Sequence, residues 1–253
     1  MAVIYLLLLS LFCRHSLADP LWKYCNQNTK TSGGGDSVST NIGHLLSQVV
    51  EKTERDSFAT TSYGQGESRV YGLGQCRGDV NNSDCSSCIE NAAKQIRLLC
   101  PIQTDARVRY EYCFLRYSKE NFFGKLDTSI GLLYANVENV TDPDSFNKAL
   151  GALFDRIDSK AIKLKNQGFG KGETKLSPFE TLYGLVQCTR DLSPLACAQC
   201  LAIALENFVG FCSDKKGCQV IYSSCYVRYE LYPFFFPLES QMSKTDNLQK
   251  LIH

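Results

Sequence analysis

The sequence has 253 residues, with 27 Lys or Arg against 26 Asp or Glu, and it contains 13 Cys. This near balance of charge gives no reason to expect a nucleic acid as partner, because nucleic acids select strongly basic surfaces. The length allows one domain or two.

Residues 1–18 have the features of a secretory signal peptide. An apolar run (AVIYLLLL) precedes small residues that end at Ala18, a suitable cleavage site. Arg14 interrupts the run before it reaches the roughly 18–20 apolar residues that a membrane span needs. We therefore predict a secreted, extracellular protein without a membrane span. Cys13 leaves with the peptide, and the remaining twelve cysteines are an even set, typical of a disulfide framework.

The chain contains an internal repeat with a constant offset of 112 residues. Residues 71–88 read YGLGQCRGDVNNSDCSSC, and residues 183–200 read YGLVQCTRDLSPLACAQC. The same register aligns later cysteines and their neighbours: Cys100 with Cys212, and Cys113-Phe-Leu-Arg-Tyr with Cys225-Tyr-Val-Arg-Tyr. A repeat of this length is a domain rather than a solenoid unit, so the sequence predicts two copies of one domain.

Four elements are predicted in the first copy. They are, in chain order, a helix containing residues 45–50, a strand over 69–75, a helix from an N-cap at Ser83 or Asp84 to about Leu99, and a strand-like run over 107–117. Apolar residues at helical spacing indicate the first helix, and Val, Tyr and Phe indicate the strands.

The second copy repeats the order. Its elements are a helix from a cap at Thr141 or Asp142 through Ile157, a strand over 181–187, a helix from Ser193 and Pro194 to about Phe211, and a strand-like run over 219–232. Pro in a first helical turn supports both helix starts. Each copy is therefore predicted to be α+β, with two helices packed on an antiparallel sheet.

The core motif of each copy is C-x8-C-x2-C, and three chemistries could use it. A zinc ribbon would place two C-x2-C pairs about 15–20 residues apart, whereas here the pairs are 112 residues apart. A redox C-x2-C pair would need cysteines without permanent partners. The structural interpretation, in which every cysteine forms a disulfide, is favoured, and no metal or cofactor is expected.

The doubled motif, with its late Cys-x2-Arg-Tyr, resembles the ginkbilobin-homologous domain, and the whole chain is similar to the plant cysteine-rich repeat secretory proteins. The resemblance implies four disulfides of one pattern and one that uses the early cysteine: Cys76–Cys85, Cys88–Cys113, Cys188–Cys197, Cys200–Cys225 and Cys25–Cys100. The second copy lacks an early cysteine, so its remaining pair would be Cys212–Cys218.

The sequence pattern also predicts the domain boundaries. We expect a signal peptide at 1–18, a first domain at 19–120, a linker at 121–138, a second domain at 139–237 and a polar tail at 238–253.

Some members resemble mannose-binding antifungal lectins, whose sugar site uses an Asn, an Arg and a Glu. In the first copy Asn26 and Arg107 match, and Ser118 stands in place of the Glu. In the second copy Glu230 matches, but Gln219 replaces the Arg. Neither copy has the full set, so Asn26 and Arg107 are candidate carbohydrate-binding residues of an incomplete site. Alternatively, Asn26 caps a turn and Arg107 forms a surface pair.

Other motifs have structural explanations beside functional ones. Asn81 and Asn139 begin N-glycosylation sequons. The Arg77-Gly78-Asp79 tripeptide matches the integrin-binding motif, which we treat as coincidence. The aromatic stretch 226–236 is expected to join the two domains.

No catalytic residue is predicted. The expected function is a non-enzymatic recognition module of the plant apoplast that binds a protein or cell-wall ligand in signalling or defence; the alternative is a mannose-binding antifungal lectin.

Overall fold

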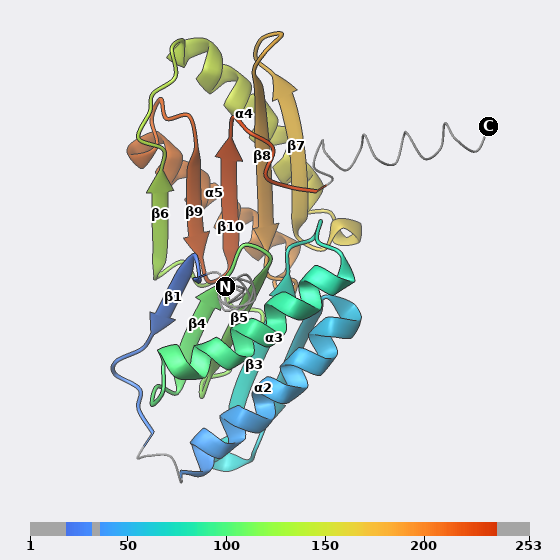
Figure 1. Ribbon diagram of the computed structural model, residues 1–253, viewed down its shortest axis with the longest axis vertical. Coiled ribbons are helices and arrows are strands. Elements are labelled where there is room, and N and C mark those ends of the chain that lie inside the picture. Colours follow the sequence, from blue (N-terminus) through green and yellow to red (C-terminus); the bar gives the residue numbers. More distant parts are fainter. Residues whose placement is uncertain (1–18, 32–35, 237–253) are drawn as a thin grey trace, which may run out of the picture.

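The computed structural model describes residues 19–31 and 36–236. The predicted signal peptide (1–18) and polar tail (238–253) lie outside the described residues. The described chain forms two units, each with a five-stranded antiparallel sheet and two helices on one face of it (Figure 1). The predicted α+β class is confirmed.

The first unit forms a sheet with the strand order β1-β4-β5-β3-β2. Its elements are β1 (Trp22–Cys25), α2 (Ser37–Asp56), β2 (Phe58–Tyr63), the 3-10 turn η2 (Gly66–Ser68), β3 (Val70–Cys76), α3 (Asn82–Leu99), β4 (Asp105–Arg109) and β5 (Cys113–Ser118).

The second unit has the equivalent strand order, β6-β9-β10-β8-β7. Its elements are β6 (Gly131–Ala135), α4 (Pro143–Ala161), η3 (Leu164–Asn166), β7 (Phe169–Lys175), β8 (Thr181–Cys188), α5 (Pro194–Phe211), β9 (Cys218–Tyr222) and β10 (Cys225–Glu230).

Two local expectations differ from the structure. The N-cap of α3 is Asn81, whose side chain accepts a hydrogen bond from the Asp84 backbone, rather than Ser83 or Asp84 themselves. The predicted linker 121–138 contains β6, which pairs with β9 along its whole length. The second sheet therefore takes its edge strand from the segment that the sequence assigned to the linker.

The central strands are buried on both faces, and alternate residues serve different cores. In β5, Leu115 and Tyr117 pack under the helices of the first unit. Phe114, between Cys113 and Leu115, packs in a cluster shared by both units. Gly74 in β3 permits close approach of α2, because a Cβ there would lie 2.5 Å from Thr53 Oγ1.

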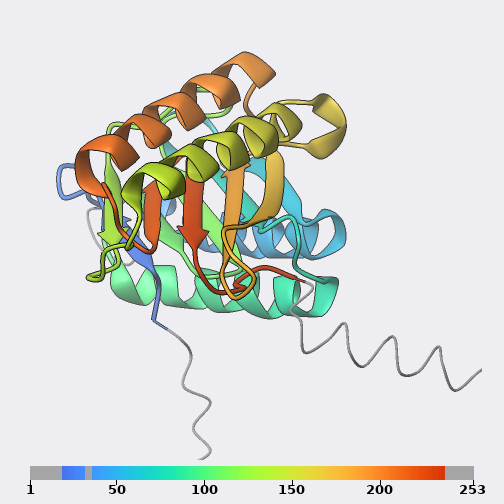
Figure 2. The ribbon, with the colours of Figure 1, turned by 90° about the horizontal axis from the view of Figure 1, so that it is seen from above.

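Figure 1 shows the two sheets offset along the long axis of the molecule, so that their helix-free faces pack together only where the units overlap, and the helices lie on the outside. Figure 2 shows α4 and α5 on one side of the molecule and α2 and α3 on the other, with both sheets between them. The shared cluster joins apolar side chains of both units: Trp22, Leu73, Phe114, Phe122, Tyr183, Leu185, Ile221, Tyr226 and Phe235. This cluster buries the parts of the two helix-free sheet faces that overlap.

Six disulfides link the twelve described cysteines. They are Cys25–Cys100, Cys76–Cys85, Cys88–Cys113, Cys188–Cys197, Cys200–Cys225 and Cys212–Cys218. The structure thus has the pairs that the resemblance and the spacing implied. In each unit the two motif cysteines of the outer helix bond to adjacent central strands, which holds that helix on its sheet.

By length and composition alone, α5 could cross a membrane, the single such helix among the described residues, with 28% of its apolar window buried. The disulfides of Cys197 and Cys200 instead hold α5 against β8 and β10. Its buried apolar side chains form part of the core of the second unit.

Candidate functional site

A polar cleft lies at one end of the first unit. The loop after β1, the turn around η2 and the ends of β3, β4 and β5 enclose a volume of about 750 Å³. Its lining is almost entirely polar: Asn26, Asn28, Thr29, Lys30, Gly66, Glu67, Arg69, Tyr71, Thr104, Asp105, Ser118, Lys119 and Glu120. The lining includes both basic and acidic side chains, and the ring of Tyr71 is its one aromatic group.

Asn26 and Ser118, two of the three positions of the family sugar site, line this cleft together. Asn26 Nδ2 donates to Asp105 Oδ2 at 3.1 Å, and its Oδ1 accepts from the Asn28 backbone at 3.1 Å. Ser118 Oγ accepts from the Glu120 backbone at 3.1 Å. Asn26 is therefore held in a fixed orientation by its own turn, as the structural alternative expected.

Asp105 is the carboxylate that the sequence analysis missed. It lies directly opposite Ser118 in the β4–β5 ladder, so it enters the cleft beside the position where the family has a Glu. Its Oδ1 is buried and has no hydrogen-bond partner within the described part of the chain. A buried acceptor of this kind normally has a partner. Because the oxygen is shielded from solvent, the Asp105 side chain would have to turn before a donor in the cleft could reach it.

Arg107 lies behind the cleft rather than in its lining. Its guanidinium forms ion pairs with Asp127 Oδ2 at 2.9 Å and with Asp105 Oδ2 at 3.5 Å, and it contacts Ser223 of the second unit. Burial raises the pKa of Asp127, but Arg107, the hydrogen bonds from Ser129 and the nearby Arg116 outweigh it and hold the pKa below its usual value. Arg107 is thus committed to the boundary between the units.

The second unit has no equivalent of the Asn26 and Ser118 pair, because it lacks an early Cys-Asn and has Glu230 at the position of Ser118. Glu230 is buried, and its Oε1 accepts from Arg228 Nε at 3.0 Å. Burial raises the pKa of Glu230 in spite of this contact. Gly217 lies so close that a Cβ there would be 2.0 Å from Glu230 Oε2. Glu230 is therefore a structural residue of the second unit.

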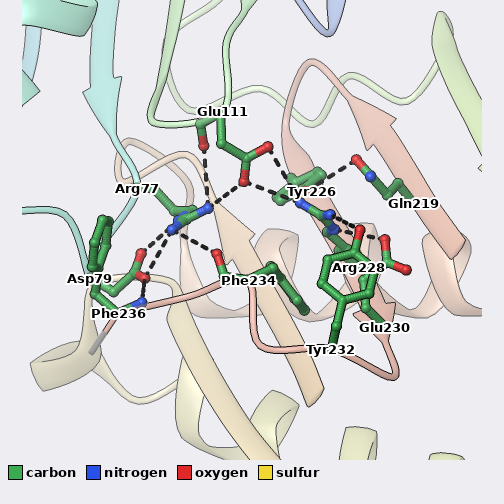
Figure 3. A network of polar contacts seen from close by, with 10 residues as sticks. All are labelled: Arg77, Asp79, Glu111, Gln219, Tyr226, Arg228, Glu230, Tyr232, Phe234 and Phe236. Carbon is green, nitrogen blue, oxygen red and sulfur yellow. Dashed lines mark hydrogen bonds and ion pairs between the residues drawn. The ribbon is translucent and has the colours of Figure 1, made fainter. Parts of the chain in front are cut away.

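Figure 3 shows the ionic network that Glu230 joins. Glu111 of the first unit accepts from Arg77 at 2.6 Å and from Arg228 of the second unit at 3.1 Å. Arg77 also pairs with Asp79 at 2.7 Å and donates to the Phe234 carbonyl at 3.3 Å. The network therefore joins the two units through charge-assisted hydrogen bonds in a largely buried setting.

The Arg77-Gly78-Asp79 tripeptide is part of this network. The side chains of Arg77 and Asp79 are 3% and 0% exposed. Asp79 also accepts from the Phe236 backbone at 2.7 Å. Since neither charged group reaches the surface, the tripeptide is an interface element and is inaccessible to an integrin.

The aromatic stretch 226–236 lies between the units, and its expected joining role is confirmed. Tyr226 and Phe235 belong to the shared cluster. The buried Arg109 guanidinium lies 4.7 Å from the Phe114 ring and 5.2 Å from the Tyr226 ring, one from each unit. Burial lowers the pKa of Arg109 to about 10, so it remains a cation at neutral pH and interacts with both rings.

The two sequons differ in their surroundings. Asn81 uses its amide twice, accepting from the Asp84 backbone and donating to the Asp84 side chain, both at 2.9 Å. Asn139 is exposed, and its Oδ1 accepts from Lys215 Nζ at 2.7 Å.

Comparison with known proteins identifies the family. The model of the salt stress response/antifungal family matches residues 24–120 and 134–232. The chain belongs to this family. It is 58% identical over 238 residues to cysteine-rich repeat secretory protein 55 of Arabidopsis thaliana, covering 92% of this chain and 90% of the relative. It is 40% identical over 220 residues to an antimicrobial ginkbilobin-2-like protein of Castanea crenata, covering 86% and 89%.

A solved structure supports the same assignment. The tandem DUF26 ectodomain of the Arabidopsis thaliana cysteine-rich receptor-like protein PDLP8 aligns with a TM-score of 0.73 and 31% identity, covering 83% of this chain and 97% of that one. The salt stress response/antifungal family member described here is thus a secreted, extracellular, disulfide-rich protein with the tandem α+β fold. Its relatives are secretory and ectodomain proteins.

Proposed function

We propose that the protein is a non-enzymatic recognition module of the plant apoplast, which binds a cell-wall or protein ligand through the polar cleft of its first unit, in signalling or defence. The observation that carries this proposal is the open polar cleft itself, whose lining includes Asp105, a carboxylate with one oxygen that the described part of the chain leaves without a partner. A ligand hydroxyl or amide that donates to this oxygen would recover the hydrogen bond that the folded chain leaves unmade.

The composition of the cleft favours a polyhydroxylated or polar ligand. Asp105 offers an acceptor, Lys30, Arg69 and Lys119 offer donors, and Tyr71 offers a ring face. Hydroxyl groups both donate and accept, so a carbohydrate surface can satisfy this mixed set.

An enzymatic role receives no support from the described residues. All twelve of their cysteines are disulfide-bonded, which leaves no thiolate nucleophile among them. His44 stacks on Tyr63 with the ring centroids 4.9 Å apart, on α2. No group of three or more metal-ligating side chains occurs within 19–31 and 36–236.

A mannose-binding antifungal lectin is the second candidate, and one observation favours it. Asp105 lies opposite Ser118, so a carboxylate is present beside the position of the missing Glu. Against it, Arg107 is buried against Asp127 and Ser223 and would have to leave these contacts to reach a sugar.

The test is a binding titration of the intact secreted protein with mannan, cell-wall oligosaccharides and extracellular proteins. For a ligand that binds in this titration, we expect Asp105→Asn to weaken the binding at least about tenfold, since a charge-assisted hydrogen bond is worth about 1.4 kcal/mol or more. Glu180→Gln, an exposed carboxylate of the second unit, is the matched control. Binding that Asp105→Asn leaves unchanged would exclude the cleft, whereas mannose binding abolished by Arg107→Ala would favour the lectin.

A further inference from the structure

A second pocket lies where the second unit meets the end of α2, away from the polar cleft. Its volume is about 400 Å³, within the range of small-molecule sites. Asp56 and Phe58 of the first unit form one part of the lining. The rest comes from the second unit, from the segment 161–168 after α4, the residues after β8 and the start of α5. Figure 1 shows the turn after α4, in yellow, at the boundary between the units. Both units therefore contribute to the pocket.

Arg190 lines this pocket as a cation without a counter-ion. Its Nη1 donates to the Asp56 carbonyl at 3.2 Å, and its guanidinium carbon lies 5.9 Å from the centre of the Phe58 ring. Its buried Nε has no hydrogen-bond partner in the part of the chain that the structure describes. Burial lowers the pKa of Arg190, and no neighbouring carboxylate opposes this effect. A half-buried arginine without a carboxylate partner is a candidate anion ligand.

The surroundings of Arg190 add positive charge. Lys163 also lines the pocket, is exposed, and forms no ion pair with any residue of 19–31 and 36–236. Residues 159–172 contain four lysines and no Asp or Glu. Asp56 is the one carboxylate in the lining, and the neighbouring Arg55 donates to its Oδ2 at 3.1 Å. The pocket therefore has an excess of positive charge that attracts an anion.

The first unit shows that the fold does not require this arrangement. At the repeat offset of 112, Arg190 corresponds to Gly78. Phe58 and Phe169 occupy equivalent positions in the β2–β3 and β7–β8 ladders. Phe169 packs directly on Gly78, where a Cβ would lie 2.6 Å from the ring, whereas Phe58 faces Arg190. A single residue joins α2 to β2, but residues 162–168 join α4 to β7. The cation and the turn beside it are therefore particular to the second unit.

We propose that this pocket binds a small carboxylate that has an apolar body. The carboxylate pairs with Arg190 and Lys163, the two cations without counter-ions. The apolar body lies against Phe58, Leu164 and Leu192, which line the same pocket. Because Leu164 is 80% exposed, covering it removes apolar surface from water. A fully polar anion would leave these side chains uncovered. A ligand of this class touches both units, so its binding also stabilises their packing.

The test is a nitrogen-15 NMR titration of the intact secreted chain with 3-phenylpropanoate as the probe. Two matched probes accompany it: 3-phenylpropanamide, which has the same body without the charge, and inorganic phosphate, which has charge without an apolar body. We expect saturable shifts of the Gly168 and Thr189 backbone amides with 3-phenylpropanoate. Both matched probes should bind at least about tenfold more weakly, because each lacks one of the two interactions.

Three variants locate the charge that matters. Arg190→Gln removes the guanidinium charge and keeps an amide donor, and should weaken 3-phenylpropanoate at least about tenfold. Lys163→Gln should weaken it about threefold, because the lysine is exposed and water screens it. Arg156→Gln is the matched control and should leave binding unchanged. Arg156 is an exposed arginine of the same unit that donates to the Glu173 carbonyl at 2.7 Å, and its loss changes the net charge equally.

Four results would overturn the proposal. They are no saturable shift at the pocket amides up to about 10 mM probe, equal binding of either matched probe, unchanged binding in both Arg190→Gln and Lys163→Gln, and shifts confined to the amides of the polar cleft. Circular dichroism verifies that each variant folds. If Arg190→Gln does not fold, Lys163→Gln and the uncharged probe still decide, since both leave the Arg190 contacts intact.

Discussion

Within residues 19–31 and 36–236, Glu111 is the single carboxylate that bonds to arginines of both units, so removing it should loosen the interface. Its contacts with Arg77 and Arg228 measure 2.6 and 3.1 Å. Hydrogen bonds to charged groups contribute about 1.5–3 kcal/mol each. Because 38% of the Glu111 side chain is exposed, water screens both contacts, and we take the lower end of that range. Glu111→Ala should therefore reduce the free energy of unfolding by about 2–3 kcal/mol.

Urea unfolding provides the assay, because urea adds no salt that would screen the ion pairs. Trp22 is the one tryptophan of the chain and belongs to the shared cluster, so its fluorescence reports on the interface. Far-UV circular dichroism reports on the helices and strands. Each unit has a core of its own, so in Glu111→Ala the fluorescence transition should occur at lower urea than the dichroism transition.

Glu180→Ala, on an exposed loop of the second unit, is the control and should change the free energy of unfolding by less than about 0.5 kcal/mol. If Glu111→Ala also stays within about 0.5 kcal/mol of the wild type, the interpretation of the network as a stabilising link is refuted.

Two further predictions concern the second unit and the sequons. Burial, with a smaller contribution from Asp155, raises the pKa of Asp158 to about 7, so the folded state binds more protons than the unfolded state between about pH 4 and 7 and stability falls as pH rises through that range. Asp158→Asn should remove this dependence and stabilise the protein at pH 7.5 by at least about 1 kcal/mol, whereas Asp155→Asn should largely retain it; urea unfolding at pH 5 and 7.5 decides. Glycopeptide mass spectrometry of plant-expressed protein should find higher occupancy at Asn139 than at Asn81, because a glycan on Asn81 Nδ2 would disturb the hydrogen bond of this atom to Asp84 Oδ2, whereas Asn139 is bonded through its Oδ1; equal occupancy would contradict this.

The core elements of each unit were predictable because local signals agree with their burial. Asp142 caps α4 by accepting from Ser145, with Pro143 in the first turn, as the sequence indicated. The repeat offset then transferred each assignment from one unit to the other. The run 107–117 was predicted as one strand-like segment because no Gly or Pro marks a reversal. The structure instead has two strands there, with a turn at 110–112 between them.

The edge strands were missed for a physical reason. β7 reads FGKGETK and β2 reads FATTSY, so neither has the continuous apolar pattern of a strand buried on both faces. Each faces a neighbour on one side and is partly exposed on the other, and tertiary pairing decides its conformation. β6 reads GLLYA, which is apolar but only five residues long, and its pairing with β9 decides its conformation.

The candidate site was only partly predictable. Asn26 and Ser118 were identified by resemblance, and the structure places both in one cleft. Asp105 was not identified, because its role depends on lying opposite Ser118 across a strand pair. Arg107 was predicted to bind a sugar, but its guanidinium lies at the boundary between the units and not in the cleft. Sequence position alone cannot show which of these two places a side chain of β4 reaches.

The interface between the units is partly symmetric. Some of its bonds occur twice: Gln75 donates to the Cys188 carbonyl at 2.9 Å, and Gln187 donates to the Cys76 carbonyl at 3.0 Å. At the offset of 112, these two bonds are related by a pseudo-two-fold axis.

The charged contacts break this symmetry. Glu111 corresponds to Ser223 at the repeat offset, and Arg77 corresponds to Thr189. If two second units were paired in this way, Arg228 would face Ser223 instead of the Glu111 carboxylate, and a buried guanidinium would lose a partner. The symmetric bonds therefore define the geometry of the interface, and the asymmetric ion pairs select a first unit as the partner of a second. Because this selection holds Arg107 against Ser223, it also fixes the back of the cleft at Asp105.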